Sequence, residues 1–337
     1  DGFLTEFKRT KDFENMIANY TKSKHCIIVN NGTISLTLAA IAAGVKAGDE
    51  VIVPNYTMIA TPNSVKMFGV NPVFVDVEKD TLCLDIDLVK KAITKKTKAI
   101  MLVSANGRYP KSGIKSFEDL CRKHDIKLIE DAAQSLGSFY PDGRHIGSAG
   151  LVGSFSFSMP KIISTGQGGA LITDNDELAA RIRKLKDFGR SGGGNDVHET
   201  IGFNFKFTEL QACIGIEQMK KLDERVEIKK SLFKKYYDQL QDIEEIELFE
   251  HNLDFTAPWF IDCKAKSRNS LMEFLKENNI GSRVMYPPLN KQKAYNIDGE
   301  HHISNSIGEL GLWLPSYAQL TDHDISHITS TIKNFYS

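Results

Sequence analysis

Short apolar runs alternate with amphipathic segments through the first half of the chain. The segments between the runs place apolar residues at helical spacing, as in residues 34–44 and 114–124. The runs themselves are rich in Val and Ile and have no regular polar face: residues 25–30, 50–54, 72–77, 98–104 and 126–131. Strands of this kind that alternate with helices are typical of a mostly parallel sheet covered on both faces. The pattern predicts an α/β protein, in which the chain becomes helical from Leu171 through residues 176–188.

The pattern changes after residue 208. Thr208 is expected to cap a helix that continues to about residue 221, and a long amphipathic helix follows over about 223–240. The remaining elements are shorter, with predicted strands at 258–263 and 283–286 and predicted helices at 270–279 and 322–335. Because 337 residues exceed the usual size of one domain, we expect a large domain over 1–222, then a connecting helix and a smaller C-terminal α+β domain over 223–337.

Composition narrows the functional classes. The formal net charge of -1 gives no long-range field that would attract nucleic acid or an anionic membrane surface. Five scattered cysteines without a Cys-x-x-Cys pair indicate free thiols in a reducing compartment, and no apolar run is long enough to span a bilayer. We therefore expect a cytoplasmic protein. His323 and His327 have the i, i+4 spacing of metal ligands but lack a third ligand, so we expect a solvated helix face and no metal.

Candidate chemistry lies at the predicted carboxyl ends of the strands, where ligands bind in open α/β sheets. Lys161 follows the alternating run 154–158 and precedes the glycine-rich stretch 165–169. Asp131 ends another apolar strand, where a buried carboxylate needs a cation or a strong donor. Simpler interpretations are a surface lysine in a glycine-rich hairpin and a helix-capping Asp131.

A second candidate site follows the first predicted strand. Asn31, Gly32 and Thr33 lie between that strand and a helix, a geometry that offers free backbone N–H groups and a positive dipole end to an anion. The simpler interpretation is an ordinary strand-to-helix turn in which Thr33 caps the helix.

Several motifs, taken in order, resemble one known family. They are Gly32-Thr33, Asp131-Ala-Ala-Gln134, Ser154-Phe-Ser-Phe, Lys161, Thr165-Gly-Gln-Gly-Gly169, Gly202-Phe-Asn-Phe-Lys-Phe-Thr-Glu-Leu-Gln211, Tyr286-Pro-Pro-Leu and Leu314-Pro-Ser. Together they resemble the DegT/DnrJ/EryC1/StrS family of sugar aminotransferases, over nearly the whole chain. The resemblance implies the fold type I of aspartate aminotransferase, with a mostly parallel mixed sheet in the large domain. It also implies pyridoxal 5′-phosphate (PLP) as cofactor and a homodimer.

The resemblance assigns a role to each matching residue. It makes Lys161 the Schiff-base lysine and Asp131 the partner of the pyridine nitrogen, which keeps the ring protonated as an electron sink. It makes Gln134 the residue that forms a hydrogen bond with the hydroxyl group of the cofactor ring. It makes Asn204 the residue that reaches the cofactor phosphate from the other subunit. The residues that match the phosphate cradle are Gly32, Thr33 and Ser156.

Three positions depart from the family pattern. Met58 stands where many relatives have an aromatic residue over the cofactor ring, so its sulfur and methylenes are expected to make that contact. Ser158 replaces a His or an aromatic residue. Arg108, in an unusual stretch before Pro110, is expected to be able to touch substrate.

The function that follows from the resemblance is transfer of an amino group from L-glutamate to a nucleotide-linked keto-deoxysugar. The Thr-Gly-Gln-Gly-Gly stretch resembles that of enzymes that aminate C4, which favours a 4-keto-6-deoxyhexose. Two alternatives stay open: a PLP-dependent sugar dehydratase, in which a histidine replaces the lysine, and a non-catalytic homologue that binds PLP or a sugar nucleotide as a signal. A nicotinamide dehydrogenase is disfavoured because no Gly-x-Gly-x-x-Gly follows the first strand.

Overall fold

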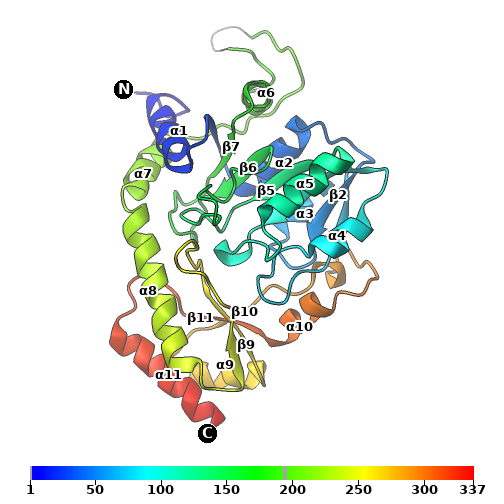
Figure 1. Cartoon of the computed structure of the whole chain (residues 1–337). Coiled ribbons are helices and arrows are strands. Elements are labelled where there is room, and N and C mark those ends of the chain that lie inside the picture. Colours follow the sequence, from blue (N-terminus) through cyan, green and yellow to red (C-terminus); the bar gives the residue numbers. More distant parts are fainter. Residues whose placement is uncertain (1, 193–195) are drawn as a thin grey trace.

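The computed structural model describes residues 2–192 and 196–337, which form two sheets of different construction (Figure 1). The larger sheet has seven strands in the order β1-β7-β6-β5-β4-β2-β3. Their bounds are β1 His25–Val29, β2 Glu50–Pro54, β3 Asn71–Val75, β4 Thr97–Val103, β5 Lys127–Asp131, β6 Val152–Ser156 and β7 Gly169–Thr173. The five runs predicted from the pattern correspond to β1 through β5.

Six strands of this sheet run in the same direction, and β7 alone of the seven runs opposite to them. Strands β3, β2, β4, β5 and β6 pair in parallel, whereas β7 pairs antiparallel with both β6 and β1. The predicted mixed sheet is confirmed, but the prediction that the chain becomes helical from Leu171 was wrong. Residues 169–173 are fully buried between two strands, and an apolar run of five residues does not distinguish a buried strand from the start of a helix.

Helices cover both faces of the large sheet. One face packs against α2 (Gly32–Ala42), α3 (Ala60–Lys66) and α6 (Asp176–Lys186). The other face packs against α1 (Lys8–Thr21), α4 (Ile86–Ala92), α5 (Ile114–His124), α7 (Glu209–Met219) and the start of α8 (Leu222–Leu240). Neighbouring strand residues point to opposite faces, so that Ile100 joins one core and Met101 joins the other. This double coverage explains why the strands have no polar face.

The second sheet is antiparallel and has the order β10-β11-β9-β8. Its strands are β8 Ile246–Leu248, β9 Ile261–Ala265, β10 Arg283–Val284 and β11 Gly311–Leu314, and its helices are α9 Arg268–Glu277, α10 His302–Leu310 and α11 Asp322–Tyr336. The long helix α8 runs from the large sheet to this second unit, where α11 lies against it (Figure 1). Strands β8 and β11 and helix α10 were not predicted from the sequence. The boundary at residue 222 stays a prediction.

Helix ends follow their local sequence. The predicted cap of α7 is confirmed, because the Thr208 hydroxyl accepts a hydrogen bond from the Gln211 N–H at 3.3 Å. The next residue, Glu209, reaches back to α1, where its Oε1 accepts the N–H groups of Phe7 and Thr10 at 2.7 and 2.9 Å. A carboxylate at a helix N-terminus satisfies free N–H groups and complements the helix dipole. Glu209 therefore fixes α1 against α7.

Buried amide and carboxylate groups connect the second unit to the edge of the large sheet. Asn55, directly after β2, exchanges two hydrogen bonds with Asn290, at 2.9 Å and 2.8 Å. Asp76, directly after β3, accepts the N–H groups of Ile303 and Ser304 at 2.8 and 3.0 Å and thereby caps the start of α10. These contacts hold residues 283–304 near the carboxyl ends of β2 and β3.

Two kinds of feature are absent from residues 2–192 and 196–337. No helix in these ranges is long and apolar enough to cross a membrane, and no group of three or more His, Cys, Asp or Glu side chains has metal-binding geometry. All five cysteines are free thiols, of which only Cys213 is exposed.

Candidate active site

Lys161 lies in the connection between β6 and β7, at the carboxyl end of β6. A turn fixes its backbone, because its N–H donates to the Ser158 carbonyl oxygen at 3.0 Å. Its Nζ lies 3.8 Å from the centroid of the Trp259 ring. Burial lowers the pKa of Lys161 to about 8, and the opposing effect of the Asp131 charge is smaller. A substantial fraction of the amine is therefore neutral, and so nucleophilic, close to neutral pH.

Asp131 ends β5 and is 5% exposed. Its Oδ2 accepts a hydrogen bond from the Thr61 hydroxyl at 2.7 Å, and its Oδ1 accepts the Ala133 N–H at 3.2 Å. Burial raises the pKa of this carboxyl group, and the hydrogen bond from Thr61 opposes the shift. The predicted strong donor is therefore a hydroxyl group. The hydrogen bond from the Ala133 N–H resembles the capping interaction that was the simpler interpretation of Asp131. Asp131 therefore combines a local capping contact with a hydrogen bond from the distant Thr61 hydroxyl.

The N-terminus of α2 lies beside the end of β6. Asn31 is its N-cap residue, with Oδ1 accepting the Ile34 N–H at 2.9 Å, so the prediction that Thr33 caps the helix was wrong. The N–H groups of Gly32 and Thr33 have no acceptor among the described residues. A Cβ atom on Gly32 would lie 2.8 Å from the Ser156 Cβ, so only glycine permits this approach. Two free N–H groups and the Ser156 hydroxyl are donors suited to a phosphate.

Gln134 follows Asp131 by one short turn. Its Oε1 accepts the Asn106 N–H at 2.6 Å, which leaves the side-chain NH₂ group without an acceptor among the residues described. A small cavity is lined by residues from this turn, the end of β6, the Lys161 connection and the second unit: Ala133, Gln134, Ser156, Lys161, Ile162 and Trp259. Three of the predicted site residues, Gln134, Ser156 and Lys161, thus line one cavity. Asp131 lies close enough for its charge to act on the pKa of Lys161.

Five predicted site residues do not line this cavity, among them Met58 and Asn204. Met58 precedes α3 with 46% of its surface exposed, and its sulfur accepts the Ala60 N–H at 3.1 Å. Asn204 is exposed in an extended segment whose next residue, Phe205, accepts the Asn30 N–H at 3.2 Å. Neither residue contacts Lys161 or Asp131 in this chain. Their roles toward a cofactor stay predictions.

Arg108 does not line the cavity around Lys161. It is 3% exposed, and its guanidinium group pairs with Asp262 through bonds of 3.1 and 2.6 Å. Its Nε–H donates to the Thr81 carbonyl oxygen at 3.0 Å. Burial lowers the pKa of Arg108, but the charge and hydrogen bonds of Asp262 outweigh this and raise it overall. These donors serve the contact between β9 and the large sheet, and a role of Arg108 toward substrate stays a prediction.

Three residues near the site were not found from the sequence. Thr61 holds Asp131, Trp259 packs on Lys161, and Tyr286 lies close enough for the Asp131 charge to add to the burial that raises its pKa to about 12. Trp259 also meets Trp313 edge to face, with 6.2 Å between the ring centroids. Only the Tyr286-Pro-Pro stretch carried a signal, as part of the family pattern. The other two contacts join residues 70 or more positions apart.

The fold and the paired Lys161 and Asp131 are typical of PLP-dependent aminotransferases. Residues 1–333 match the model of the DegT/DnrJ/EryC1/StrS aminotransferase family, and the chain belongs to that family. It is a PLP-dependent sugar aminotransferase, and the expected fold and cofactor are confirmed.

Relatives and solved structures cover nearly the whole chain. The GDP-perosamine synthase of Vibrio cholerae is 34% identical over 96% of this chain and 90% of its own length. A pleiotropic regulatory protein of Geobacillus stearothermophilus is 31% identical over 97% and 89%. The structure of S. venezuelae DesV in complex with a ketimine intermediate superposes with a TM-score of 0.94 at 30% identity, covering 100% of this chain and 91% of DesV.

The residues present fit PLP. Lys161 offers an amine that can bond the cofactor aldehyde, and Asp131 offers a buried carboxylate for the ring nitrogen. The close approach of Gly32 to Ser156 places two N–H groups beside the Ser156 hydroxyl, which donates to Ser158 Oγ at 3.3 Å and can rotate toward a phosphate. Each part of the cofactor, the aldehyde, the ring nitrogen and the phosphate, thus has a group of suitable chemistry in this chain.

Proposed function

We propose that this enzyme transfers the amino group of L-glutamate to C4 of a nucleotide-linked 4-keto-6-deoxyhexose. The observation that carries the proposal is the partly buried Lys161 amine, near Asp131 in a cavity shared with Gln134 and Ser156. Overall, the amino group and the keto oxygen change places, so glutamate leaves as 2-oxoglutarate and no external oxidant or reductant is needed. Because the synthase relatives are GDP-perosamine synthases, a GDP-linked sugar is the first acceptor to test.

Lys161 carries out the proton transfers in this proposal. PLP, when bound, supplies an electron sink that stabilises negative charge at the carbon that loses its proton. The Lys161 amine takes a proton from the glutamate α-carbon and returns it on the cofactor side, and it reverses these transfers for the sugar. A lowered pKa suits both roles, because the amine can accept and release a proton near neutral pH.

Asp131 and Gln134 hold the cofactor ring in this proposal. The Asp131 carboxylate would accept a hydrogen bond from the protonated ring nitrogen and so keep the ring protonated, while the Thr61 hydroxyl orients the carboxylate. The pKa that burial raises in the free protein is expected to fall when the positive ring nitrogen pairs with it. Gln134 is oriented by Asn106 and donates its NH₂ group to the ring hydroxyl.

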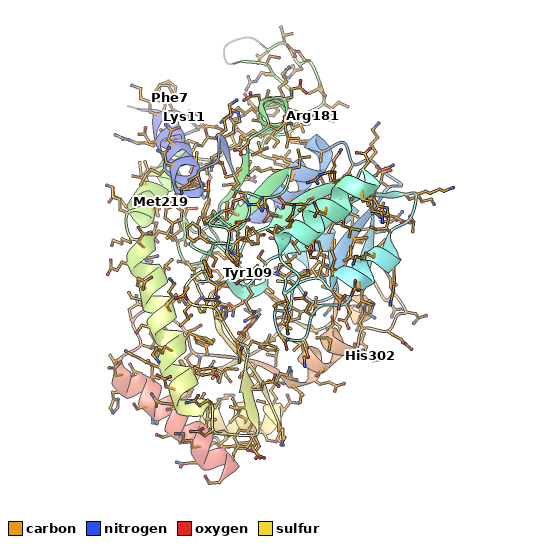
Figure 2. The ribbon with its side chains drawn as sticks, viewed as in Figure 1. Phe7, Lys11, Tyr109, Arg181, Met219 and His302 are labelled. Atoms are coloured by element: carbon orange, nitrogen blue, oxygen red, sulfur yellow. The ribbon has the colours of Figure 1, made fainter. Side chains whose placement is uncertain are left out.

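A partner subunit completes the phosphate site in this proposal. Asn204 is exposed on a segment beside Asn30 and is free to reach a second copy. Support comes from apolar side chains on the neighbouring surface of α1 and α7, where Phe7 lies at the outer end of α1 (Figure 2). Leu210 and Ile214 are 64% and 50% exposed, which is unusual for a monomer surface. We infer a homodimer with a shared site.

Absorption spectra of the purified protein with PLP test the proposal. Addition of L-glutamate alone should remove the visible band of the lysine-bound cofactor, and a GDP-linked 4-keto-6-deoxyhexose should restore it with one amino sugar formed per turnover. Lys161→Ala should show no such band. Loss of the band with glutamate, but no return with any 4-keto sugar, would overturn the C4 assignment.

Two variants separate the other parts of the proposal. Asn204→Ala should weaken PLP retention in the dimer by roughly 10- to 150-fold, since a lost hydrogen bond to a charged group costs about 1.5–3 kcal/mol. Light scattering measures the oligomeric state. A protein that is monomeric by this measurement and fully active would refute the shared site. Lys161→His should abolish amino transfer, and retained turnover in that variant would refute the role of Lys161.

The relative described as a pleiotropic regulatory protein favours a second candidate function. A regulatory homologue would bind PLP or a sugar nucleotide without turnover. The glutamate step separates the two, because a non-catalytic homologue would keep its visible band when glutamate is added.

A further inference from the structure

Trp259 connects the second unit of the protein to Lys161. It lies just before β9, while Lys161 belongs to the connection between β6 and β7 of the large sheet. Its indole ring is 3% exposed, and the Lys161 Nζ lies over the ring face at 3.8 Å. A lysine amine centred over an indole face is attracted in its charged form by the negative face of the ring.

Hydrogen bonds fix the orientation of Trp259 in addition to its packing in the core. Its Nε1–H donates to the carbonyl oxygen of Pro160 at 2.6 Å, so the ring is fixed to the residue directly before Lys161. Its own carbonyl oxygen accepts from the buried Lys229 Nζ at 3.0 Å. Lys229 lies on α8 and also donates to the carbonyl oxygen of Ser316. The backbone and the ring of Trp259 are thus held separately.

The residue after Trp259 is held as firmly. The side chain of Asn106 donates to the Phe260 carbonyl oxygen at 2.8 Å and accepts the Phe260 N–H at 2.6 Å. Asn106 has a φ of +55°, which few residues other than glycine and asparagine adopt readily. The N–H of Asn106 donates to Gln134, so the Trp259 backbone is connected to the cavity from two sides.

We propose that Trp259 is a positioning residue that holds the Lys161 ammonium group whenever the lysine is not bonded to the cofactor. This inference rests on the proposed function of Lys161. During each turnover the lysine is released and must stay within reach of the carbon that exchanges its proton. A flexible four-carbon side chain would otherwise sample many rotamers, and the ring face limits this freedom.

The pH dependence of cofactor capture by the apoprotein provides the test. Capture requires the neutral amine, so the rate rises with pH through the pKa of Lys161. The captured cofactor is fixed with borohydride, and the Lys161 peptide is quantified by mass spectrometry. Removal of the ring face removes an interaction that favours the ammonium form. The midpoint in Trp259→Leu should therefore fall by about one pH unit, and Trp259→Phe should lie between native and leucine protein.

Controls separate this role from core packing. Trp313→Leu removes the other buried indole, 6.2 Å away, and should leave the midpoint within about 0.2 pH units of native while it lowers stability. In Trp259→Leu, kcat should fall about tenfold with the KM for glutamate little changed. If Trp259→Leu does not fold, Trp259→Met replaces it, because methionine is an apolar side chain without a ring.

The outcomes are distinct. Equal midpoints in the native, Trp259→Phe and leucine or methionine proteins would overturn the inference and leave Trp259 as a core residue. A midpoint that falls equally in Trp313→Leu would also overturn it. Failure of native protein to capture PLP at Lys161 would instead refute the proposed function.

Discussion

The pair of Arg108 and Asp262 and the pair of Lys161 and Asp131 combine opposite charges in the protein interior, but their surroundings differ. Arg108 and Asp262 contact each other directly through two hydrogen bonds, and a carbonyl oxygen satisfies a further donor of Arg108. Lys161 and Asp131 influence each other's charge without a direct ion pair, and Lys161 faces a cavity. A buried charge that is fully paired serves the fold, whereas one with unused bonding capacity beside a cavity is available to a ligand. The difference separates structural from functional charges more reliably than residue type does.

Removal of Lys161 should have the largest effect on activity and little effect on stability. Lys161→Ala removes the amine that moves the proton, which is expected to lower kcat by at least 10²–10⁴-fold. Because the amine has no ion-pair partner, the free energy of unfolding of the apoprotein should not fall by more than about 1 kcal/mol. Steady-state kinetics and urea denaturation check the two halves. If Lys161→Ala destabilised the protein as much as Arg108→Met, the proposed difference between the functional pair and the structural pair would be contradicted.

Removal of Arg108 should give the opposite result. Arg108→Met leaves the Asp262 carboxylate buried and unpaired, which is expected to cost about 3–5 kcal/mol of unfolding free energy. Cofactor capture by the folded fraction should stay normal, as measured by the visible band per folded molecule. The matched double variant Arg108→Met/Asp262→Leu should recover most of the stability, since no charge is then left unpaired. A selective loss of sugar turnover in folded protein would instead support a role of Arg108 in substrate binding.

The two regions should also differ in their pH dependence. Burial lowers the pKa of Lys161 to about 8, below its usual value of 10.5. The neutral fraction of the amine therefore grows about tenfold between pH 7 and pH 9, and the rate of cofactor capture by apoprotein should rise with it. The stability that Lys161 contributes should rise from pH 8 to 10.5, because the unfolded chain binds the extra proton there. Stopped-flow absorbance measures the capture rate; a flat profile across this interval would contradict a lowered pKa.

The smallest effect is expected from the hydroxyl group that supports Asp131. Thr61→Val removes the donor at 2.7 Å and should raise the pKa of Asp131 further. Without that donor, PLP affinity should fall about fivefold, as expected for a net loss of about 1 kcal/mol. Thr57→Val is the matched control, because the Thr57 hydroxyl contacts Thr61 at 3.0 Å. Equal PLP dissociation constants for the Thr61 variant and native protein would show that the hydroxyl does not tune the carboxylate.

The sequence predicted what depends on local pattern. Apolar runs identified the parallel strands, and the ends of those strands located Lys161 and Asp131. The cap of α7 was likewise readable, because Thr208 and the helix it starts are adjacent. Such patterns can be predicted because the interactions that produce helical periodicity and capping involve residues only a few positions apart.

Contacts between distant residues escaped prediction. The pairing of Arg108 with Asp262 spans 154 positions, so nothing near Arg108 indicated that its donors were already used. Trp259 lies 98 positions from Lys161 in the sequence. The apolar stretch around Trp259 did not indicate a contact with Lys161. Strand β7 was mistaken for the start of a helix, because only its pairing with the distant strands β1 and β6 makes this apolar run a strand. In each case, tertiary packing supplied information that local sequence lacks.

The two tryptophans make the site visible without a label. The chain has only two, Trp259 and Trp313, and they lie edge to face beside the active-site cavity. Indole fluorescence therefore comes entirely from the surroundings of the candidate active site, with no contribution from other tryptophans. PLP absorbs in the region where indoles emit, so its arrival should quench most of the signal by energy transfer. The protein thus contains its own optical reporter for cofactor loading.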